Sequence, residues 1–142
     1  MKILDLFNNT NFKNTEIKKP YIIAEAGVNH EGDMDIARRL INDAAEAGAD
    51  AIKFQTYKAN TIASKFSPPY WDTTKETTKS QYELFKKYDK FWKPEYEQLK
   101  SLCDELGIEF MSTPFDIESA NFLNDLMSVF KISSSDITNK PF

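Results

Sequence analysis

The sequence predicts an α/β fold built on a parallel sheet, and three observations lead to this prediction. Short apolar runs alternate with segments of helical periodicity along most of the 142 residues. The best-marked unit, residues 21–55, reads as a strand, a capped helix and a second strand, which is a right-handed parallel βαβ unit. Polar residues fall near the carboxyl ends of the strands, where parallel α/β proteins bind their ligands.

The first strand and the helix after it are marked at both ends. Residues 21–26 form a short Ile-containing run that is typical of a buried strand, with Glu25 as its one carboxylate. Apolar residues then recur at helical spacing, with Asp33 where an N-cap belongs and Gly48 just past the last turn. We therefore expect one complete helix between two strands.

The second strand covers residues 51–55, where the pattern returns to a period of two. Its apolar side chains share one face, and Lys53 and Gln55 share the other. A buried charge is costly unless it is paired or meets a ligand, so Glu25 and Lys53 indicate either a ligand site or a structural ion pair.

A long connection of residues 56–79 follows, and it exceeds an ordinary βα turn. It is either a functional loop or a disordered segment. Ser80 is expected to cap a short helix, and Pro94 to open a longer one that Gly107 ends. The inward residues of these helices are expected to be Tyr82, Phe85, Tyr88, Tyr96, Leu99, Leu102 and Leu106.

Two more strands are expected in the last third of the chain. Residues 108–112 form the third, and Asp116 caps a helix that reaches Met127. Residues 129–133 form the fourth, on which Lys131 occupies the same kind of face as Lys53.

Four strands and three crossovers are half of a closed (β/α)₈ barrel, which typically needs about 250 residues. We expect residues 1–19 to be an arm with a short strand or hairpin, and residues 20–142 to be the amino-terminal half of a barrel domain. The fourth strand would leave an open edge and interior for another chain or the missing half to cover. The alternative is a small open sheet with helices on both faces.

The composition narrows the function classes. The net charge is -4, without a basic stripe, so nothing indicates nucleic-acid binding. No apolar run approaches the roughly 20 residues of a membrane span, and no secretory signal is visible, so we expect a cytoplasmic protein. Cys103 lies at core spacing and is expected to pack rather than react. The single histidine, His30, excludes a multi-histidine metal site within the chain.

Four motifs in order, AEAGVNHEGD, ADAIKFQTY, FMSTPFD and FKISSSDITNKPF, resemble the amino-terminal half of the sialic acid synthase family from about Pro20 onward. The resemblance implies a TIM barrel, here about its first four βα units, with the rest of the barrel and a carboxyl-terminal antifreeze-like domain absent. It implies condensation of phosphoenolpyruvate with an N-acetylated hexosamine to a nonulosonic acid and phosphate. It also implies a divalent metal, Mn²⁺ or Mg²⁺, with ligands beyond Phe142, and a homodimer at full length.

The resemblance also assigns substrate-binding residues. Lys53, Lys131 and Ser134 match positions that contact phosphoenolpyruvate, whose negative charges call for cations and hydroxyl donors. Gln55 matches a position that contacts the sugar.

Two acidic residues match catalytic positions of the family. Glu25 would orient water or shuttle a proton, and Asp136 would steady the intermediate at the former enol carbon. The family commonly has glycines where Ser133 and Ser135 stand here. His30 belongs to the first loop and is not assigned to the metal; it bonds to backbone or shapes the sugar pocket.

Three readings stay open at this stage. The first is the synthase, whose isolated 142-residue part we expect to be inactive. The second is a Schiff-base aldolase with Lys53 or Lys131 as nucleophile, and the third is a truncated chain that only binds a ligand or partner. The acceptor is left among N-acetylmannosamine, its phosphate, and the diacetamido sugars that lead to legionaminic or pseudaminic acid. The sequence from Tyr82 to Leu99 is more similar to bacterial members of the family.

Overall fold

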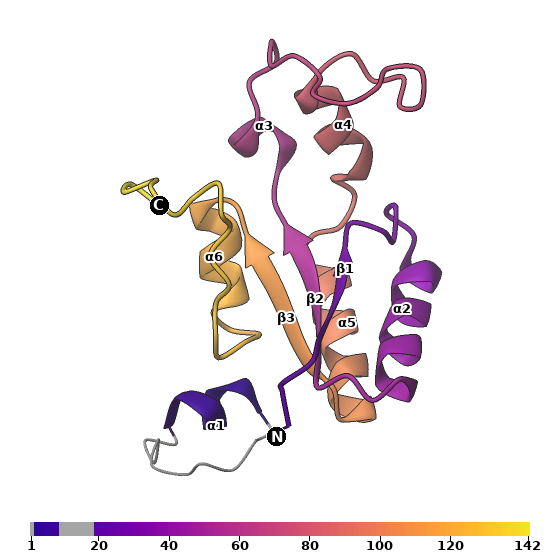
Figure 1. Ribbon diagram of the computed structural model, residues 1–142, viewed down its shortest axis with the longest axis vertical. Coiled ribbons are helices and arrows are strands. Elements are labelled where there is room, and N and C mark those ends of the chain that lie inside the picture. The colour runs from indigo at the N-terminus through magenta and orange to yellow at the C-terminus, as the bar shows by residue number, and fades with distance from the viewer. Residues whose placement is uncertain (1, 9–18) are drawn as a thin grey trace.

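A three-stranded parallel sheet forms the centre of the computed structural model, which describes residues 2–8 and 19–142 (Figure 1). Its strands are β1 (Ile23–Gly27), β2 (Ala51–Thr56) and β3 (Glu109–Pro114), in that order across the sheet. All three strands run toward the same end of the molecule, as the arrowheads of Figure 1 show. The α/β class and the parallel pairing predicted from the sequence are confirmed.

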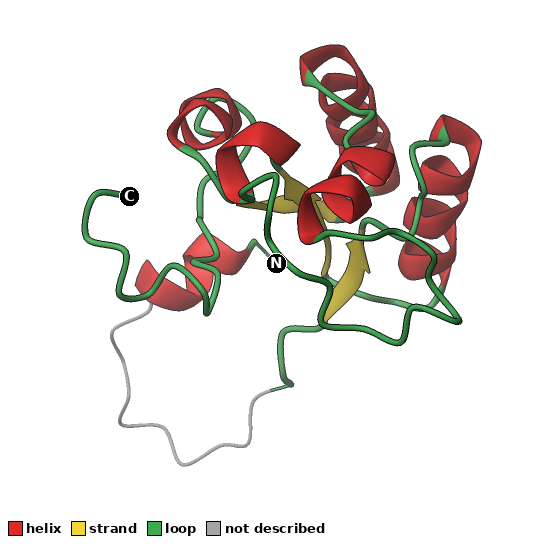
Figure 2. Ribbon diagram, turned by 90° about the horizontal axis from the view of Figure 1, so that it is seen from above, coloured by secondary structure: helices red, strands yellow, loops and turns green. Residues whose placement is uncertain are grey.

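Two long helices cover one face of this sheet. They are α2 (Met34–Glu46) and α5 (Lys93–Leu106), which also pack against each other. Viewed from above, helices line one side of the strands in an arc (Figure 2). Asp33 caps α2 by accepting hydrogen bonds from two backbone N–H groups, and Gly107 ends α5 in the left-handed conformation.

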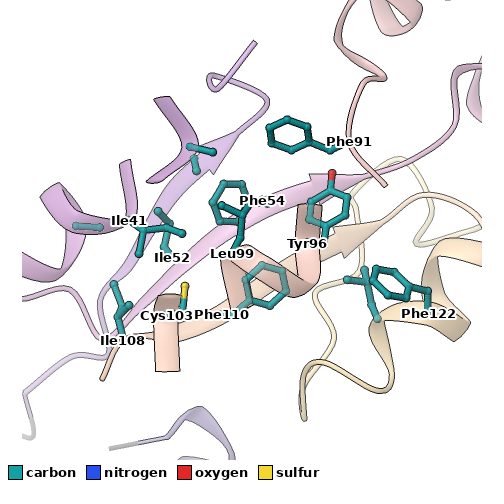
Figure 3. Packing of buried hydrophobic residues seen from close by; sticks show 14 residues of the cluster. Ile41, Ile52, Phe54, Phe91, Tyr96, Leu99, Cys103, Ile108, Phe110 and Phe122 are labelled. Carbon is teal, nitrogen blue, oxygen red and sulfur yellow. The ribbon is translucent and has the colours of Figure 1, made fainter. Parts of the chain in front are cut away.

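The hydrophobic core lies between the sheet and these helices (Figure 3). Its centre is made of Ile52 and Phe54 from β2, Phe110 from β3, Ile41 from α2 and Leu99 from α5. The apolar side chains of β2 therefore share one face, as the period-two pattern predicts, and this face packs against the helices. Cys103 is fully buried in the same core, so the expectation of a packing role is confirmed.

The long connection after β2 is folded over the carboxyl ends of the strands. It contains α3 (Ala59–Ile62), and α4 (Gln81–Tyr88) follows with Ser80 as its cap. Asp89 holds the start of the connection by pairing with Lys58 at 3.0 Å and accepting from the Ala59 N–H at 2.9 Å. The start of the connection is therefore held against the C-cap residue of α4. The side chains expected inside α4 are only half-buried, and Leu106 of α5 is exposed.

The predicted fourth strand is not formed. After α6 (Ile117–Leu123), which ends one turn short of Met127, residues 129–133 run without ladder pairing to β3. The backbone N–H of Ser112 on β3 instead donates to the sulfur of Met127 at 3.3 Å. In this unpaired segment Phe130 and Ile132 are exposed.

In the amino-terminal part of the chain, residues 3–8 lie at the opposite end of the sheet from α3 and α4 (Figure 1). Residues 3–8 form the helix α1 (Ile3–Asn8) rather than a strand, and the remainder of the expected hairpin, residues 9–18, lies outside the described residues. Glu109 joins the arm to β3 because its carboxylate accepts from the Ile3 N–H at 2.7 Å and from the Tyr21 hydroxyl at 2.5 Å.

Within residues 2–8 and 19–142, every helix is too short or too polar to cross a membrane.

Candidate functional site

An ion pair between Glu25 and Lys53 stands on the sheet face that points away from α2 and α5. The two residues occupy paired positions on β1 and β2, and neighbours in a parallel sheet point to the same side. Their side chains form a hydrogen-bonded ion pair. Lys53 is buried, whereas the side chain of Glu25 is 52% exposed, so solvent or a ligand can reach the pair from the carboxylate side.

Gln55 lies one layer further along β2, at the carboxyl end of the strand. β1 bulges between Glu25 and Gly27, which has a φ of +54°. A Cβ atom built on Gly27 would lie 3.5 Å from Glu25 Oε1 and 3.6 Å from Gln55 Nε2. The carboxylate and the carboxamide thus both lie beside Gly27 and close to the lysine, and three of the six predicted site residues come together.

The loop after β1 is fixed by a buried histidine. His30 is 1% exposed, its Nδ1 accepts from the Gly32 N–H at 3.0 Å, and its ring stacks on Phe91 with 4.2 Å between centroids. Burial lowers the pKa of His30 to about 4, so the ring is neutral near pH 7. The expected hydrogen bond between His30 and the backbone is therefore confirmed. Its Nε2 is buried and has no hydrogen-bond partner among the described residues.

Thr113 is a site residue that the sequence reasoning missed. It pairs with Gln55 in the β2–β3 register and therefore shares the face of Lys53. The residue is 2% exposed, and its hydroxyl oxygen is buried without a hydrogen-bond partner in the described part of the chain. The sequence did contain a signal for this residue. If the period-two pattern of the third strand is extended past Ser112, it places Thr113 on this face.

The predicted site residues after α6 do not join Lys53 on a strand. Lys131 and Ser134 are exposed, and Asp136 bonds locally to the side chains of Ser135 and Asn139. The expectation that Lys131 lies on a fourth strand, on the same kind of face as Lys53, is wrong, because no ladder forms there. The catalytic and binding roles of these residues stay predictions.

The two serines that stand where the family resemblance predicts glycines bond to each other. The hydroxyls of Ser133 and Ser135 are 2.7 Å apart, and the Ser135 N–H donates to the Ser133 hydroxyl. Ser135 also lines a cavity together with Gln55, so the segment does reach the carboxyl end of β2.

A divalent metal does not fit the residues present here. Among the described residues, no group of three or more histidine, cysteine, aspartate or glutamate side chains could hold an ion. The Glu25 carboxylate, which is nearest to the predicted chemistry, is already occupied by the Lys53 ammonium. We therefore assign no catalytic step to a metal held by this chain.

The fold and site define a partial (β/α)₈ barrel in which a buried lysine, a carboxylate and a carboxamide meet at the carboxyl ends of parallel strands. The chain belongs to the NeuB family, whose model matches residues 40–142. It is also similar to a crystal structure of N-acetylneuraminic acid (sialic acid) synthetase from Leptospira borgpetersenii, with a TM-score of 0.69 and 34% identity over 87% of this chain and 39% of that one. The predicted family and barrel class are confirmed.

Curated relatives agree with this assignment. The N,N'-diacetyllegionaminic acid synthase of Campylobacter jejuni is 44% identical over 89% of this chain and 38% of its own length. The N-acetylneuraminate-9-phosphate synthase of Mus musculus is 38% identical over 86% of this chain and 34% of its own length. The chain therefore spans little more than a third of the relatives that it matches.

Proposed function

We propose that this chain is the phosphoenolpyruvate-binding part of a cytoplasmic nonulosonic acid synthase. The complete enzyme joins phosphoenolpyruvate to N-acetylmannosamine or a related diacetamido sugar and releases phosphate. A divalent metal, Mn²⁺ or Mg²⁺, is held by residues outside this chain, and the complete enzyme is a homodimer. Relatives named as legionaminic and neuraminate synthases support the reaction class.

One observation carries the proposal, namely the buried Lys53 on a strand whose carboxyl end also presents Gln55. A buried ammonium with a half-exposed partner can exchange that partner for an anionic ligand at little cost, because the Glu25 carboxylate then returns to water. The phosphate and carboxylate of phosphoenolpyruvate are such anions.

The other predicted site residues are suited to the bond-forming and water-addition steps of the reaction. The methylene carbon of phosphoenolpyruvate bonds to the sugar aldehyde carbon as the C=O π bond breaks, and the aldehyde oxygen takes a proton to become a hydroxyl. Water then adds to the electron-poor former enol carbon and loses a proton, and the C–O bond to phosphate breaks, so that phosphate leaves and a keto group remains. Glu25, freed from Lys53, accepts a proton from that water or orients it. Gln55 contacts the sugar, and Lys131, Ser134 and Asp136 would complete the site once their segment pairs with β3.

The first test is ligand binding to the 142-residue chain. Titration with phosphoenolpyruvate, followed by ¹⁵N chemical shifts, should perturb the backbone signals of Lys53, Glu25 and Thr113, and Lys53→Met should abolish the effect. Lys65→Met, in the loop after α3, is the matched control and should bind as the parent does. Equal binding by both variants would contradict the assignment of Lys53.

The second test measures the reaction itself. The chain is grafted in place of the matching segment of the Campylobacter jejuni synthase, and phosphate release is followed with phosphoenolpyruvate, Mn²⁺ and acylamino sugars. Release that requires both substrates and disappears in Lys53→Met supports the synthase. Borohydride trapping of a carbonyl substrate on Lys53 would instead support the aldolase alternative.

A further inference from the structure

The loop after β1 packs against the connection between α4 and α5. The ring of His30 lies parallel to that of Phe91, with 6° between the planes and 4.2 Å between centroids. Lys90 Nζ donates to the Glu31 carbonyl at 3.2 Å. Glu31 has a φ of +52°, which is uncommon for a residue other than glycine, so these contacts hold the loop in a conformation that costs free energy. Two segments distant in the sequence are therefore joined at a defined place.

The hydrogen bond at Nδ1 determines which nitrogen of His30 carries the proton. Nδ1 accepts from the Gly32 N–H, and the ring is neutral near pH 7 because burial lowers its pKa. The single proton of the neutral ring is then on Nε2, which is a donor. Nε2 is buried, and none of the residues that the structure describes accepts from it. A buried donor normally has an acceptor, so a partner other than these residues is expected.

A cavity of about 10 Å³ lies beside the His30 side chain. This is roughly the volume that one ordered water needs. Its polar lining includes Gln55, Tyr88 and Asp89 as well as His30. Because the space admits one small molecule, these side chains surround the same position. Nδ1 of His30 is already bonded, so Nε2 is the nitrogen that is available to the cavity.

Asp89 supplies an acceptor at this position. Its side chain is 12% exposed, and its two oxygens accept from Lys58 Nζ at 3.0 Å and from the Ala59 N–H at 2.9 Å. A carboxylate has about four lone-pair sites, so each oxygen can accept a further bond. The same residue thus reaches both the cavity and the start of the connection after β2.

Charge and size select the occupant of the cavity. The Nε2–H proton of His30 disfavours a metal ion, because a metal would need that nitrogen unprotonated. The Asp89 carboxylate disfavours an anion. A molecule of several heavy atoms exceeds the volume. Water meets these limits, since it accepts from one group and donates to another.

We propose that this cavity binds one ordered water, which accepts from His30 Nε2–H and donates to the Asp89 carboxylate. The Gln55 carboxamide and the Tyr88 hydroxyl offer the partner for its second O–H group. His30 is then a positioning residue, because through the water it ties the loop after β1 to the two segments that Asp89 holds. The site goes beyond the proposed synthase function, since it requires no substrate.

NMR spectra of the 142-residue chain test the water directly, and the chain has one histidine, so the ring signals belong to His30. Long-range ¹H–¹⁵N correlation at pH 7 should show the neutral tautomer with its proton on Nε2. In a ROESY spectrum this proton should give a cross-peak to water with the sign of a dipolar contact, whereas exchange with solvent gives the opposite sign. A proton on Nδ1, or no dipolar contact with water, would overturn the proposal.

A double-mutant cycle tests the link between His30 and Asp89. His30→Phe keeps a ring for the stack on Phe91 but removes the donor, and Asp89→Asn weakens the acceptor. The joint effect on the equilibrium constant of unfolding should differ at least about threefold from the product of the single effects. The control cycle pairs His30→Phe with Asp50→Asn, whose carboxylate accepts from the Ile22 N–H just before β2, and its effects should multiply within about twofold.

The two measurements together decide the proposal. Single effects that simply multiply in the cycle with Asp89 would show that the two side chains are not linked, and the water bridge would be rejected. Coupling without the dipolar contact to water would mean a direct bond, which also contradicts the bridge. If Asp89→Asn does not fold, the ROESY measurement on the parent chain decides alone.

Discussion

The two partners of the ion pair between Lys53 and Glu25 differ sharply in exposure. The Lys53 side chain is 11% exposed, whereas that of Glu25 is 52% exposed. Without the carboxylate, the buried ammonium of Lys53 has lost its partner. Without the lysine, the carboxylate of Glu25 is still reached by water. The pair therefore stabilises the fold mainly by making Lys53 tolerable in its buried position.

We expect Glu25→Gln to lower the free energy of unfolding by about 1–3 kcal/mol, and Lys53→Met to lower it by less than about 1 kcal/mol. Urea denaturation followed by circular dichroism measures both values. Equal losses would mean that solvent reaches the lysine as readily as the carboxylate.

His30 should make stability depend on pH. Its pKa is lowered by burial from 6.5 to about 4 in the folded chain. Between these values the unfolded chain binds a proton that the folded chain does not, so the free energy of unfolding falls as pH decreases, by about 3 kcal/mol in total. Above pH 6.5 and below about pH 4 this contribution is flat.

Denaturation of the parent and of His30→Gln across pH 3.5–7.5 tests this dependence, and the difference between the two curves isolates the histidine from the carboxylates. NMR titration of the His30 ring gives its pKa directly. A ring that titrates near 6.5 would show that its burial is not maintained in solution.

The N-cap of α6 bonds to a neighbouring segment as well as to its own helix. Asp116 accepts from the Ser119 N–H at 2.7 Å, and also from the Lys58 N–H at 3.2 Å and the Thr61 hydroxyl at 3.0 Å. One carboxylate thus caps a helix and also holds the connection that follows β2. Among the described residues, the Asp33 carboxylate by contrast accepts only from N–H groups at the start of its own helix.

We expect Asp116→Ala to lower the free energy of unfolding by about 2 kcal/mol, and Asp33→Ala by about 1 kcal/mol. Chemical denaturation compares the two variants. A loss at Asp116 no larger than that at Asp33 would mean that the bonds to Lys58 and Thr61 add nothing to stability.

The caps at Asp33, Ser80 and Asp116 were predictable from the sequence because each acts on backbone within its own first turn. The fourth strand was not. Residues 129–133 alternate correctly, but strand formation also requires a paired edge and a covered face, and neither is encoded in those five residues. Local signals therefore predicted helix ends better than sheet membership.

At the scale of the whole molecule, the reactivity of Cys103 measures how often the folded chain unfolds. It is fully buried among core residues, and burial raises the pKa of its thiol to about 12. Modification by a thiol reagent at pH 8 should be at least about 1,000-fold slower in the folded chain than in urea, because it requires unfolding. Cys103→Ala with Ser101→Cys moves the thiol to an exposed position of the same helix and should react rapidly in both conditions. Rapid reaction of folded Cys103 would contradict a closed core.

The assembly of the site was only partly predictable. Glu25, Lys53 and Gln55 follow from the strand period and the parallel pairing, so the sequence sufficed to bring them together. The burial of His30 depends on Phe91, which precedes a different helix, and that of Thr113 on the packing of the completed sheet. Such contacts between distant segments leave no periodic signal.

The register of the sheet also sets an order of events during folding. Glu25 and Lys53 meet across 28 residues, whereas the hydroxyls of Thr56 and Ser112 meet across 56. Doubling a loop costs about 0.6 kcal/mol more closure entropy, and the shorter loop carries a self-capped helix. We expect the β1–α2–β2 unit to form the nucleus, so that Ile41→Val slows refolding, whereas Leu123→Ala mainly accelerates unfolding, as stopped-flow chevron plots would reveal.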